Sequence, residues 1–255
     1  MSDLHGKVGL VTGGNGGIGA AIALALAEAG ASVAIAARNA DKNRAMQLEL
    51  ERRGCECLVQ RVDVRLEDDL RDCLDAIAAR WGRLDMLVNN AGIARRSLAT
   101  ELSLTAWHEV LDTNLTAAFL GARYAAPLMA RGGGGKILNI GSMYSYFGAA
   151  QVAAYAASKS GLLGLTRTLA VELAPQNIQV NALAPGWFVT DLTRRFENLP
   201  TGDAILARTP AGRWGTGADL QGPALFLLSE ASDFVTGQIL AVDGGFSISG
   251  INIIE

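Results

Sequence analysis

Tyr155 and Lys159 are the two side chains in this sequence best suited to proton transfer, because they lie four residues apart in an alanine-rich segment. The segment Gln151 to Pro175 is predicted to be helical, with leucines spaced along one face. A helix places residues four apart on one face, one turn from each other. A lysine ammonium favours the phenolate, so we expect Lys159 to lower a Tyr155 pKa that starts at about 10. Such a tyrosine can act as acid or base at a carbonyl or carbinol oxygen, the alternative being a half-exposed helix face without chemistry.

A glycine-rich loop, Thr12 to Gly19, separates the first predicted strand from the first predicted helix. Glycines allow positive φ and let a pyrophosphate approach the amides at a helix N-terminus, where the helix dipole favours anions. The loop contains the dinucleotide fingerprint Gly-x-Gly-x-x-Gly. We therefore expect it to bind a dinucleotide, the alternative being a tight turn without a ligand. The candidate contacts in the loop are Gly13, Asn15, Gly16, Gly17, Ile18 and Gly19.

The end of the second predicted strand indicates which dinucleotide binds. This position often carries an acid that holds the adenine ribose of NAD, whereas residues 36–39 here read Ala-Ala-Arg-Asn. A guanidinium suits the 2′-phosphate of NADP, so Arg38 favours NADP over NAD, unless Asp41 neutralises it. Asp63 follows the third predicted strand, and we expect it to accept a hydrogen bond from the adenine amino group.

Strand-like and helical segments alternate along the chain, which indicates a parallel sheet covered on both faces. The predicted strands are Val8–Val11, Val33–Ala37, Cys57–Val62, Leu84–Val88, Lys136–Ile140, Ile178–Leu183 and Gln238–Val242. The predicted helices are Ile18–Ala29, Asp41–Arg53, Glu67–Trp81, a helical region from Leu104 to Arg131, Gln151–Pro175 and Ala218–Ser229. No linker divides the sequence, so we expect one doubly wound α/β domain over residues 1–255.

Composition excludes several classes of function. A formal net charge of −3 over 255 residues argues against a nucleic acid or an anionic membrane as partner, since either requires a basic face. The apolar run from residue 20 to residue 37 is interrupted by Gly30-Ala31-Ser32, so we expect no membrane span. Two histidines give little basis for a metal site. An odd, clustered set of cysteines fits the reduced thiols of a cytoplasmic protein, namely Cys55, Cys57 and Cys73.

Taken together, these motifs resemble the short-chain dehydrogenase/reductase family over essentially the whole chain. The elements that match the family in order are the Thr12 to Gly19 loop, Asp63-Val64, Asn89-Asn90-Ala91-Gly92, Asn114, Ser142, Tyr155-x-x-x-Lys159, Pro185-Gly186 and Asp243-Gly244-Gly245. The resemblance implies a Rossmann-like sheet of seven parallel strands in the order 3-2-1-4-5-6-7. It also implies an NAD(P)-dependent oxidoreductase that interconverts a secondary alcohol and a ketone.

The resemblance further assigns roles to single residues. It implies that Ser142 hydrogen bonds the substrate oxygen, Tyr155 exchanges the proton and Lys159 holds the nicotinamide ribose. Asn114 completes the tetrad by holding a water wired to Lys159, the alternative being a satisfied buried amide. The other cofactor contacts that it implies are Arg38, Asn39, Asp63, Val64, Asn90, Ala91, Gly92, Pro185, Gly186, Phe188 and Thr190.

The substrate region is less closely defined. Met143 and Trp187 are expected to contact the substrate beside Ser142 and Tyr155, under a mobile cover at about residues 187–215. Three arginines of that cover could meet an acidic substrate such as a sugar acid, or could simply form a solvated face; they are Arg194, Arg195 and Arg208. Residues 139–143 and 209–215 resemble the gluconate 5-dehydrogenase and 2-deoxy-gluconate 3-dehydrogenase subgroup, and similar runs occur in 3-oxoacyl-carrier-protein reductases.

Several alternatives stay open. Reduction of a 3-oxoacyl thioester is the alternative reaction, with Arg95-Arg96 as the candidate patch for a carrier protein, and a nucleotide-sensing regulatory protein is the non-enzyme alternative. The chain departs from the family pattern at Asn15-Gly16, where a basic residue often lies, so the expected NADP preference rests on Arg38 alone. A homotetramer is the family's usual assembly, and we expect the apolar tail from Ser249 to Glu255 to pack at a subunit interface.

Overall fold

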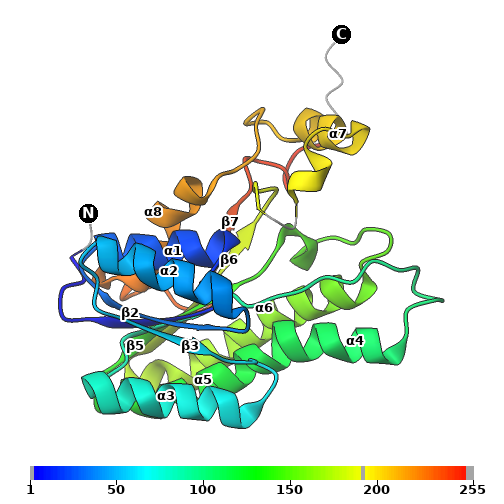
Figure 1. Ribbon diagram of the computed structural model, residues 1–255. Helices are drawn as coiled ribbons and strands as arrows, with labels where there is room; N and C mark the ends of the chain where they lie inside the picture. The colour runs from blue at the N-terminus through cyan, green and yellow to red at the C-terminus, as the bar shows by residue number, and fades with distance from the viewer. Residues whose placement is uncertain (1–2, 191–192, 251–255) are drawn as a thin grey trace.

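The computed structural model describes residues 3–190 and 193–250, and its centre is a seven-stranded parallel sheet (Figure 1). The strands are β1 (Val8–Thr12), β2 (Ser32–Ala37), β3 (Cys57–Arg61), β4 (Met86–Asn89), β5 (Gly135–Ile140), β6 (Ile178–Pro185) and β7 (Ile239–Val242). Their order in the sheet is β3-β2-β1-β4-β5-β6-β7, and all neighbouring pairs are parallel. The predicted fold and strand order are confirmed.

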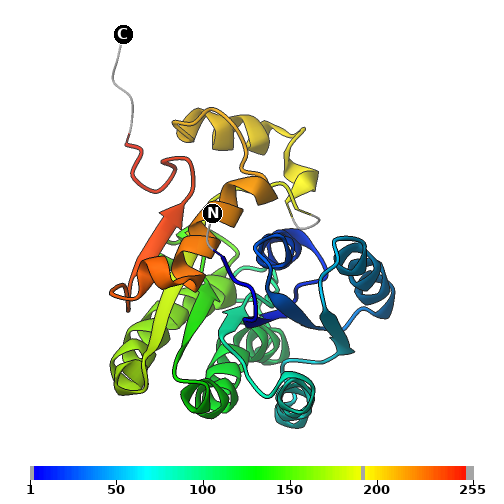
Figure 2. The ribbon, with the colours of Figure 1, turned by 90° about the vertical axis from the view of Figure 1, so that its left-hand side faces the viewer.

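Helices cover both faces of the sheet, as the view turned by 90° shows (Figure 2). One face carries α1 (Gly17–Glu28), α2 (Ala40–Arg52) and α8 (Gly217–Leu228), and the other carries α3 (Glu67–Trp81), α5 (Ala117–Arg131) and α6 (Ala153–Leu173). Successive residues of a strand point to opposite faces, so Ile35 packs in the first layer and Ala34 in the second. Among the described residues, no helix combines the length and the apolar character that a bilayer span requires.

The predicted helical region from Leu104 to Arg131 contains a widened turn. Helix α4 (Leu104–Leu111) runs into a π-helical turn, Asp112–Thr116, before α5 begins. Asn114 lies in this turn and bonds twice to the backbone of Ile93, which follows β4: Ile93 N–H donates to Oδ1 at 2.8 Å, and Nδ2 donates to Ile93 O at 3.0 Å. A π turn changes the direction in which the side chains of a helix point. Here the turn lies where the Asn114 amide faces the segment that follows β4.

Three other expectations differ from the structure or lie beyond it. Helix α6 begins at Ala153 rather than Gln151, because Gln151 has a φ of 66° and so lies outside the helical region. The same helix ends at Leu173, since Pro175 belongs to a following 3₁₀ turn. Of the tail predicted to pack at an interface, residues 251–255 lie outside the described residues.

Candidate active site

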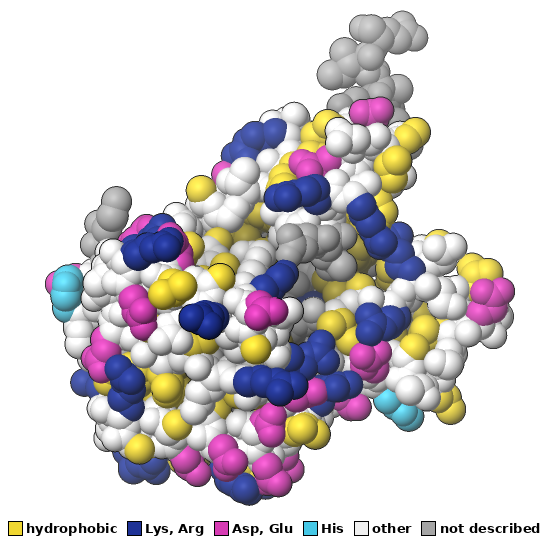
Figure 3. All heavy atoms as spheres, in the orientation of Figure 1, with side chains coloured by type: hydrophobic (Ala, Val, Ile, Leu, Met, Phe, Trp, Pro, Cys, Tyr) yellow, Lys and Arg dark blue, Asp and Glu magenta, His cyan; other side chains and the backbone are white. Residues whose placement is uncertain are grey.

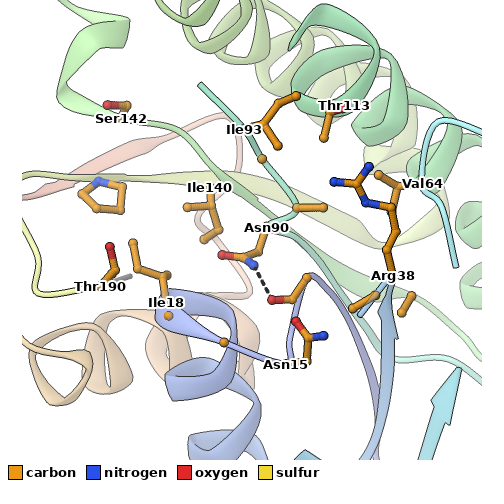
Figure 4. Close-up of a pocket in the computed structure, with 18 of the residues that line it drawn as sticks. Asn15, Ile18, Arg38, Val64, Asn90, Ile93, Thr113, Ile140, Ser142 and Thr190 are labelled. Carbon is orange, nitrogen blue, oxygen red and sulfur yellow. Dashed lines mark hydrogen bonds between the residues drawn. The ribbon is translucent and has the colours of Figure 1, made fainter. Parts of the chain in front are cut away.

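A cleft of about 550 Å³ runs along the carboxyl ends of the central strands. Its walls come from the segments that follow β1, β3, β4, β5 and β6 and from the end of β2. In a doubly wound sheet this edge is where ligands bind, at the point where the strand order reverses. Figure 4 shows Ser142 and Thr190 at one end of the cleft and Arg38 and Val64 at the other. The fold therefore places the two predicted subsites in one continuous cleft.

The phosphate loop lies close against the end of β4. Gly13 has a φ of +63°, and a Cβ on it would lie 3.0 Å from the Asn90 amide nitrogen and 3.1 Å from the Cα of Ala91. The Asn90 amide donates to the carbonyls of Thr12 and Gly13 at 2.9 and 3.1 Å. Gly16, the N-cap of α1, has no side chain to occupy the first-turn amides. The loop thus leaves room and N–H donors for an anion at the helix N-terminus.

Gly19 belongs to the packing of this loop rather than to the cleft wall. A Cβ on Gly19 would lie 2.3 Å from the Asn90 amide nitrogen and 2.5 Å from the carbonyl oxygen of Gly13. Gly19 is absent from the cleft lining, whereas the other five predicted loop contacts line it. Gly19 therefore lets α1 approach the loop, and its contact with the cofactor stays a prediction.

The far end of the cleft carries Arg38, whose side chain is half exposed and extends towards Val64 (Figure 4). Its guanidinium lies 4.0 Å from Asp63, so its nearest described acid is Asp63 and not Asp41. Asp63 itself is held at 2.6 Å by Arg65, and hydrogen bonds from Arg65 are the main reason why the pKa of the Asp63 carboxyl lies below its ordinary value. Asp63 lines the cleft as predicted, but Arg65 already engages the carboxylate that was expected to accept from adenine.

Ser142, Tyr155 and Lys159 meet at the other end of the cleft. Ser142 follows β5 and caps the 3₁₀ turn Met143–Ser145, and its hydroxyl hydrogen bonds the Tyr155 side chain. Lys159 is 4 % exposed, donates from Nζ to the carbonyl oxygen of Ile140 at 2.6 Å, and lies 5.8 Å from the centroid of the Tyr155 ring. The three predicted residues are therefore brought together at this end of the cleft.

Burial dominates the proton affinities of this group. It raises the pKa of Tyr155, and the hydrogen bond from Ser142 opposes that rise. It also lowers the pKa of Lys159 from 10.5 to about 8. The predicted lowering of the Tyr155 pKa by Lys159 is wrong for this arrangement, because burial raises that pKa and the ammonium of Lys159 donates to the carbonyl oxygen of Ile140.

Asn114 stands behind the cleft and does not line it. Its amide is satisfied by Ile93 and by the hydroxyl of Ser158, to which Nδ2 donates at 3.0 Å. A Cβ on Gly92 would lie 3.4 Å from the Asn114 Oδ1 and 3.6 Å from the Lys159 Nζ, so both groups border the same small region. The direct contacts of Asn114 are therefore those of a buried amide whose oxygen and nitrogen are both hydrogen bonded, which was the alternative to the relay. Because Asn114 also lies near Lys159, the water relay between them stays a prediction.

Two further serines form hydrogen bonds with the backbone of the helix that carries Tyr155 and Lys159. The Ser158 hydroxyl donates to the carbonyl oxygen of Tyr155 at 2.7 Å. The Ser145 hydroxyl donates to the carbonyl oxygen of Lys159 at 2.9 Å and accepts from the backbone N–H of Ser142 at 3.3 Å. Ser145 thus joins the loop that carries Ser142 to the helix that carries Lys159.

Aromatic side chains form the wall beside Tyr155. Tyr144 packs edge-on against Tyr155 with ring centroids 6.2 Å apart, and Trp187 packs edge-on against Tyr144 at 6.4 Å. Met143 and Trp187, predicted to touch the substrate, lie in the apolar cluster of this wall and do not line the cleft itself. Trp187 supports Tyr144 in this wall, and the contact of Met143 and Trp187 with the substrate stays a prediction.

The cleft lining also includes residues that were not expected as contacts: Ala36, Ala37, Lys42, Val62, Ile93, Thr113, Ile140, Gly141 and Thr193. Most of them lie next to a predicted contact at the end of a strand. A prediction that included one or two neighbours of each motif would therefore have contained them. Lys42 and Thr113 come from helical segments, and their approach to the cleft depends on how those segments pack.

The lining fits a dinucleotide. The glycines at the N-terminus of α1 leave room for a pyrophosphate, Arg38 lies where an adenine ribose would end, and Lys159 lies with Tyr155 where a nicotinamide ribose would end. The predicted contacts Pro185, Gly186, Phe188 and Thr190 line the wall beside Ser142. A cofactor that spans the cleft would therefore present its two ends to these two groups of residues.

Comparisons with known proteins agree with this geometry. The family model described as enoyl-(acyl carrier protein) reductase matches residues 13–247. The chain is 40% identical over 248 residues to the 2-dehydro-3-deoxy-D-gluconate 5-dehydrogenase of Formosa agariphila, covering 96% of this chain and 94% of that protein. The structure of a gluconate 5-dehydrogenase from Burkholderia cenocepacia in complex with NADP and tartrate matches with a TM-score of 0.93 at 40% identity, over 97% of this chain and 98% of that one.

A short-chain type dehydrogenase/reductase from Mycobacterium ulcerans matches with a TM-score of 0.94 at 34% identity, over 97% of this chain and 92% of that one. Sequence motifs, strand order and cleft all agree with these matches. The chain therefore belongs to the short-chain dehydrogenase/reductase family and is an oxidoreductase of that family.

Proposed function

We propose that this protein is an NADP-dependent dehydrogenase that interconverts a secondary alcohol and a ketone in a sugar acid. The observation that carries the proposal is one continuous cleft with Ser142, Tyr155 and Lys159 at one end and Arg38 at the other. Relatives named for gluconate and 2-dehydro-3-deoxy-D-gluconate 5-dehydrogenation match over nearly the whole chain and support the substrate class.

The proton-transfer step follows from the contacts of Tyr155. Burial keeps its phenol protonated at neutral pH, so the side chain is ready to donate a proton to a carbonyl oxygen. The Ser142 hydroxyl, which already hydrogen bonds the phenol, is placed to donate to the same substrate oxygen as negative charge grows on it. In the reverse direction Tyr155 accepts the proton of the alcohol. The nicotinamide, when bound, supplies or accepts the hydride.

Charge in the cleft supports NADP over NAD. Among the described residues that line it are three cationic side chains, Arg38, Lys42 and Lys159, and one acidic side chain, Asp63. The chain as a whole carries a formal charge of −3, so the positive lining is a local feature. Figure 3 shows Lys and Arg side chains gathered around the hollow on this face. A ligand with an additional phosphate suits such a site better than one without it.

Two arginines beside the aromatic wall support an acidic substrate. Arg208, at the end of α7 (Pro200–Arg208), stacks on the rings of Phe147 and Phe246 with its Cζ 5.0 and 4.4 Å from their centroids. Arg96 stacks on Phe196 at 4.9 Å. Their positive charges oppose the rise that burial causes in the pKa of Tyr144, the ring that packs on Tyr155.

Neither arginine forms an ion pair with a carboxylate among residues 3–190 and 193–250. Arg95, the other half of the patch considered for a carrier protein, pairs with Glu109 at 3.0 Å. The positive charge of Arg96 and Arg208 therefore lies beside the aromatic wall and acts on Tyr144, which supports a small acid over a carrier-bound thioester.

We expect Arg208→Gln to raise the KM for gluconate by about tenfold, because a guanidinium–carboxylate contact stabilises binding by more than a kcal/mol. The measurement is the initial rate of NADP⁺ reduction with gluconate and, in parallel, with an uncharged polyol such as sorbitol. The matched control is Arg194→Gln, which removes the same charge from the same segment. A rise in KM that is equal for gluconate and the polyol would contradict the carboxylate contact, and the absence of turnover of any sugar acid by the wild type would contradict the proposed substrate class.

We also propose that residues 1–255 act as one dinucleotide-binding oxidoreductase domain in the cytoplasm, with residues 187–215 as a cover over the substrate. Helix α7 of this segment lies over the carboxyl edge of the sheet (Figure 1), which supports the cover. A homotetramer is proposed as well, because large apolar side chains are exposed on α5, on α6 and near β7, namely Phe119, Val171, Phe234 and Leu240. Light scattering of the purified protein tests this assembly, and a monomer would exclude it.

A further inference from the structure

The phosphate loop has a cation beside it in the structure, although the loop itself contains none. Lys42 lies in the first turn of α2 and lines the cleft together with Arg38. Its Nζ is 3.9 Å from the point that a Cβ on Gly16 would occupy. The position Asn15-Gly16, where the sequence lacks a basic side chain, therefore has one supplied from the neighbouring helix.

Asparagine side chains hold the loop and this helix together. The Asn15 amide donates to Asn43 Oδ1 at 2.7 Å, and the buried Asn43 amide donates to the carbonyl oxygen of Ala37 at 2.9 Å. Asn39 caps α2 by accepting from the backbone N–H of Lys42 at 2.9 Å. The first turn of α2 is thus fixed between the end of β2 and the phosphate loop, and Lys42 is attached at a defined place above the loop.

Arg38 is not the only source of positive charge among the described residues at this end of the cleft. Its guanidinium lies 4.0 Å from Asp63, which reduces the field that it exerts on a ligand. The ammonium of Lys42 comes from the other side, over Gly16, and the N-terminus of α2 adds the positive end of its dipole. An anion between the strand end and the loop would face both side chains.

We propose that Lys42 is a second determinant of NADP preference and contacts the 2′-phosphate of the adenine ribose together with Arg38. The proposal rests on the NADP-dependent function proposed above. NADP and NAD differ by this phosphate alone, so a residue that contacts it changes the binding of NADPH and not of NADH. A residue that contacts the pyrophosphate changes the binding of both.

The experiment is a fluorescence titration of the wild type, Lys42→Met, Arg38→Ala and the double variant with NADPH and with NADH. We expect Lys42→Met to raise the Kd for NADPH by about tenfold, because a charge-assisted contact to phosphate is lost, and to leave the Kd for NADH little changed. The double variant should show no preference between the two nucleotides. Lys42→Arg should restore NADPH binding, because it keeps the charge.

Arg44→Met is the matched control, since it removes a positive charge from an exposed position of α2 that does not line the cleft. It should leave both Kd values unchanged, and an effect equal to that of Lys42→Met would mean that general charge, not contact, is responsible. Equal weakening of NADPH and NADH in Lys42→Met, or no weakening, overturns the role of Lys42 and leaves the proposed function standing. Equal binding of both nucleotides by the wild type overturns the proposed cofactor itself.

Discussion

Replacing Tyr155 by phenylalanine is expected to reduce kcat by about 10³-fold while NADPH binds with nearly unchanged Kd. The substitution removes one oxygen and keeps the ring that packs edge-on against Tyr144. Only the proton donor and the hydrogen bond from Ser142 are lost. The measurements are the initial rate with NADP⁺ and gluconate and a fluorescence titration with NADPH on the same preparation.

Tyr144→Phe is the matched control, because it removes the same atom from the adjacent ring, which does not line the cleft. It should keep most of the turnover. A Tyr155→Phe variant that retains turnover would exclude proton transfer by this residue. Because burial raises the pKa of Tyr155, the protonated form prevails at neutral pH, so wild-type alcohol oxidation should accelerate as the pH rises, whereas the residual rate of the variant should not follow that profile.

The parallel sheet and most of the cleft were predictable because their causes are local, whereas the strand order was implied by the family resemblance. Short apolar strands alternate with helices, and parallel strands bring the residues that follow them to one edge of the sheet. Asn90, Ser142 and Gly186 each follow a strand, and all three line the cleft. Tyr155 and Lys159 could be predicted to lie on one face because they are four residues apart in a predicted helix.

The remaining features depend on contacts between distant segments. Asn114 contacts Ile93 and Ser158 because α4 changes to a π turn before α5 begins. No spacing of residues in the sequence predicts that turn. Lys42 reaches the phosphate loop because Asn15 bonds to Asn43 across 28 positions. A helix start with a charged residue is usually a solvated surface, so the sequence alone could not distinguish Lys42 from that case.

The pKa of Tyr155 was mispredicted for a related reason. The spacing of Tyr155 and Lys159 gives their separation along a helix but not how much water reaches them, and desolvation decides the direction of the shift here. Burial of the Lys159 ammonium also lowers the stability of the folded chain. When the pKa of a lysine in the folded chain is about 8, burying its charge lowers the free energy of unfolding by the full amount below pH 8. In that range both the folded and the unfolded chain hold the proton.

Lys159→Met should therefore have opposite effects on activity and stability. We expect turnover to fall by about 10³-fold, because the ammonium beside Tyr155 and the proposed contact with the nicotinamide ribose are lost. We expect the free energy of unfolding at pH 7 to rise by about 1–2 kcal/mol, since the removed charge costs more than the lost hydrogen bond to Ile140 contributes. Denaturant unfolding without added nucleotide measures the second effect, because bound ligand would itself stabilise the folded chain.

The sign of the pH dependence distinguishes this explanation from a general benefit of removing a buried amine. Between pH 8 and 10.5 the folded wild type releases the Lys159 proton while the unfolded chain keeps it, so the wild type gains stability and its difference from Lys159→Met should shrink. Lys136→Met is the control, because the buried Lys136 pairs with Asp233 at 2.6 Å and its loss leaves that carboxylate without its partner. It should lower stability at pH 7. A Lys159→Met variant less stable than the wild type at pH 7 would show that the ammonium supports the fold as well as the reaction.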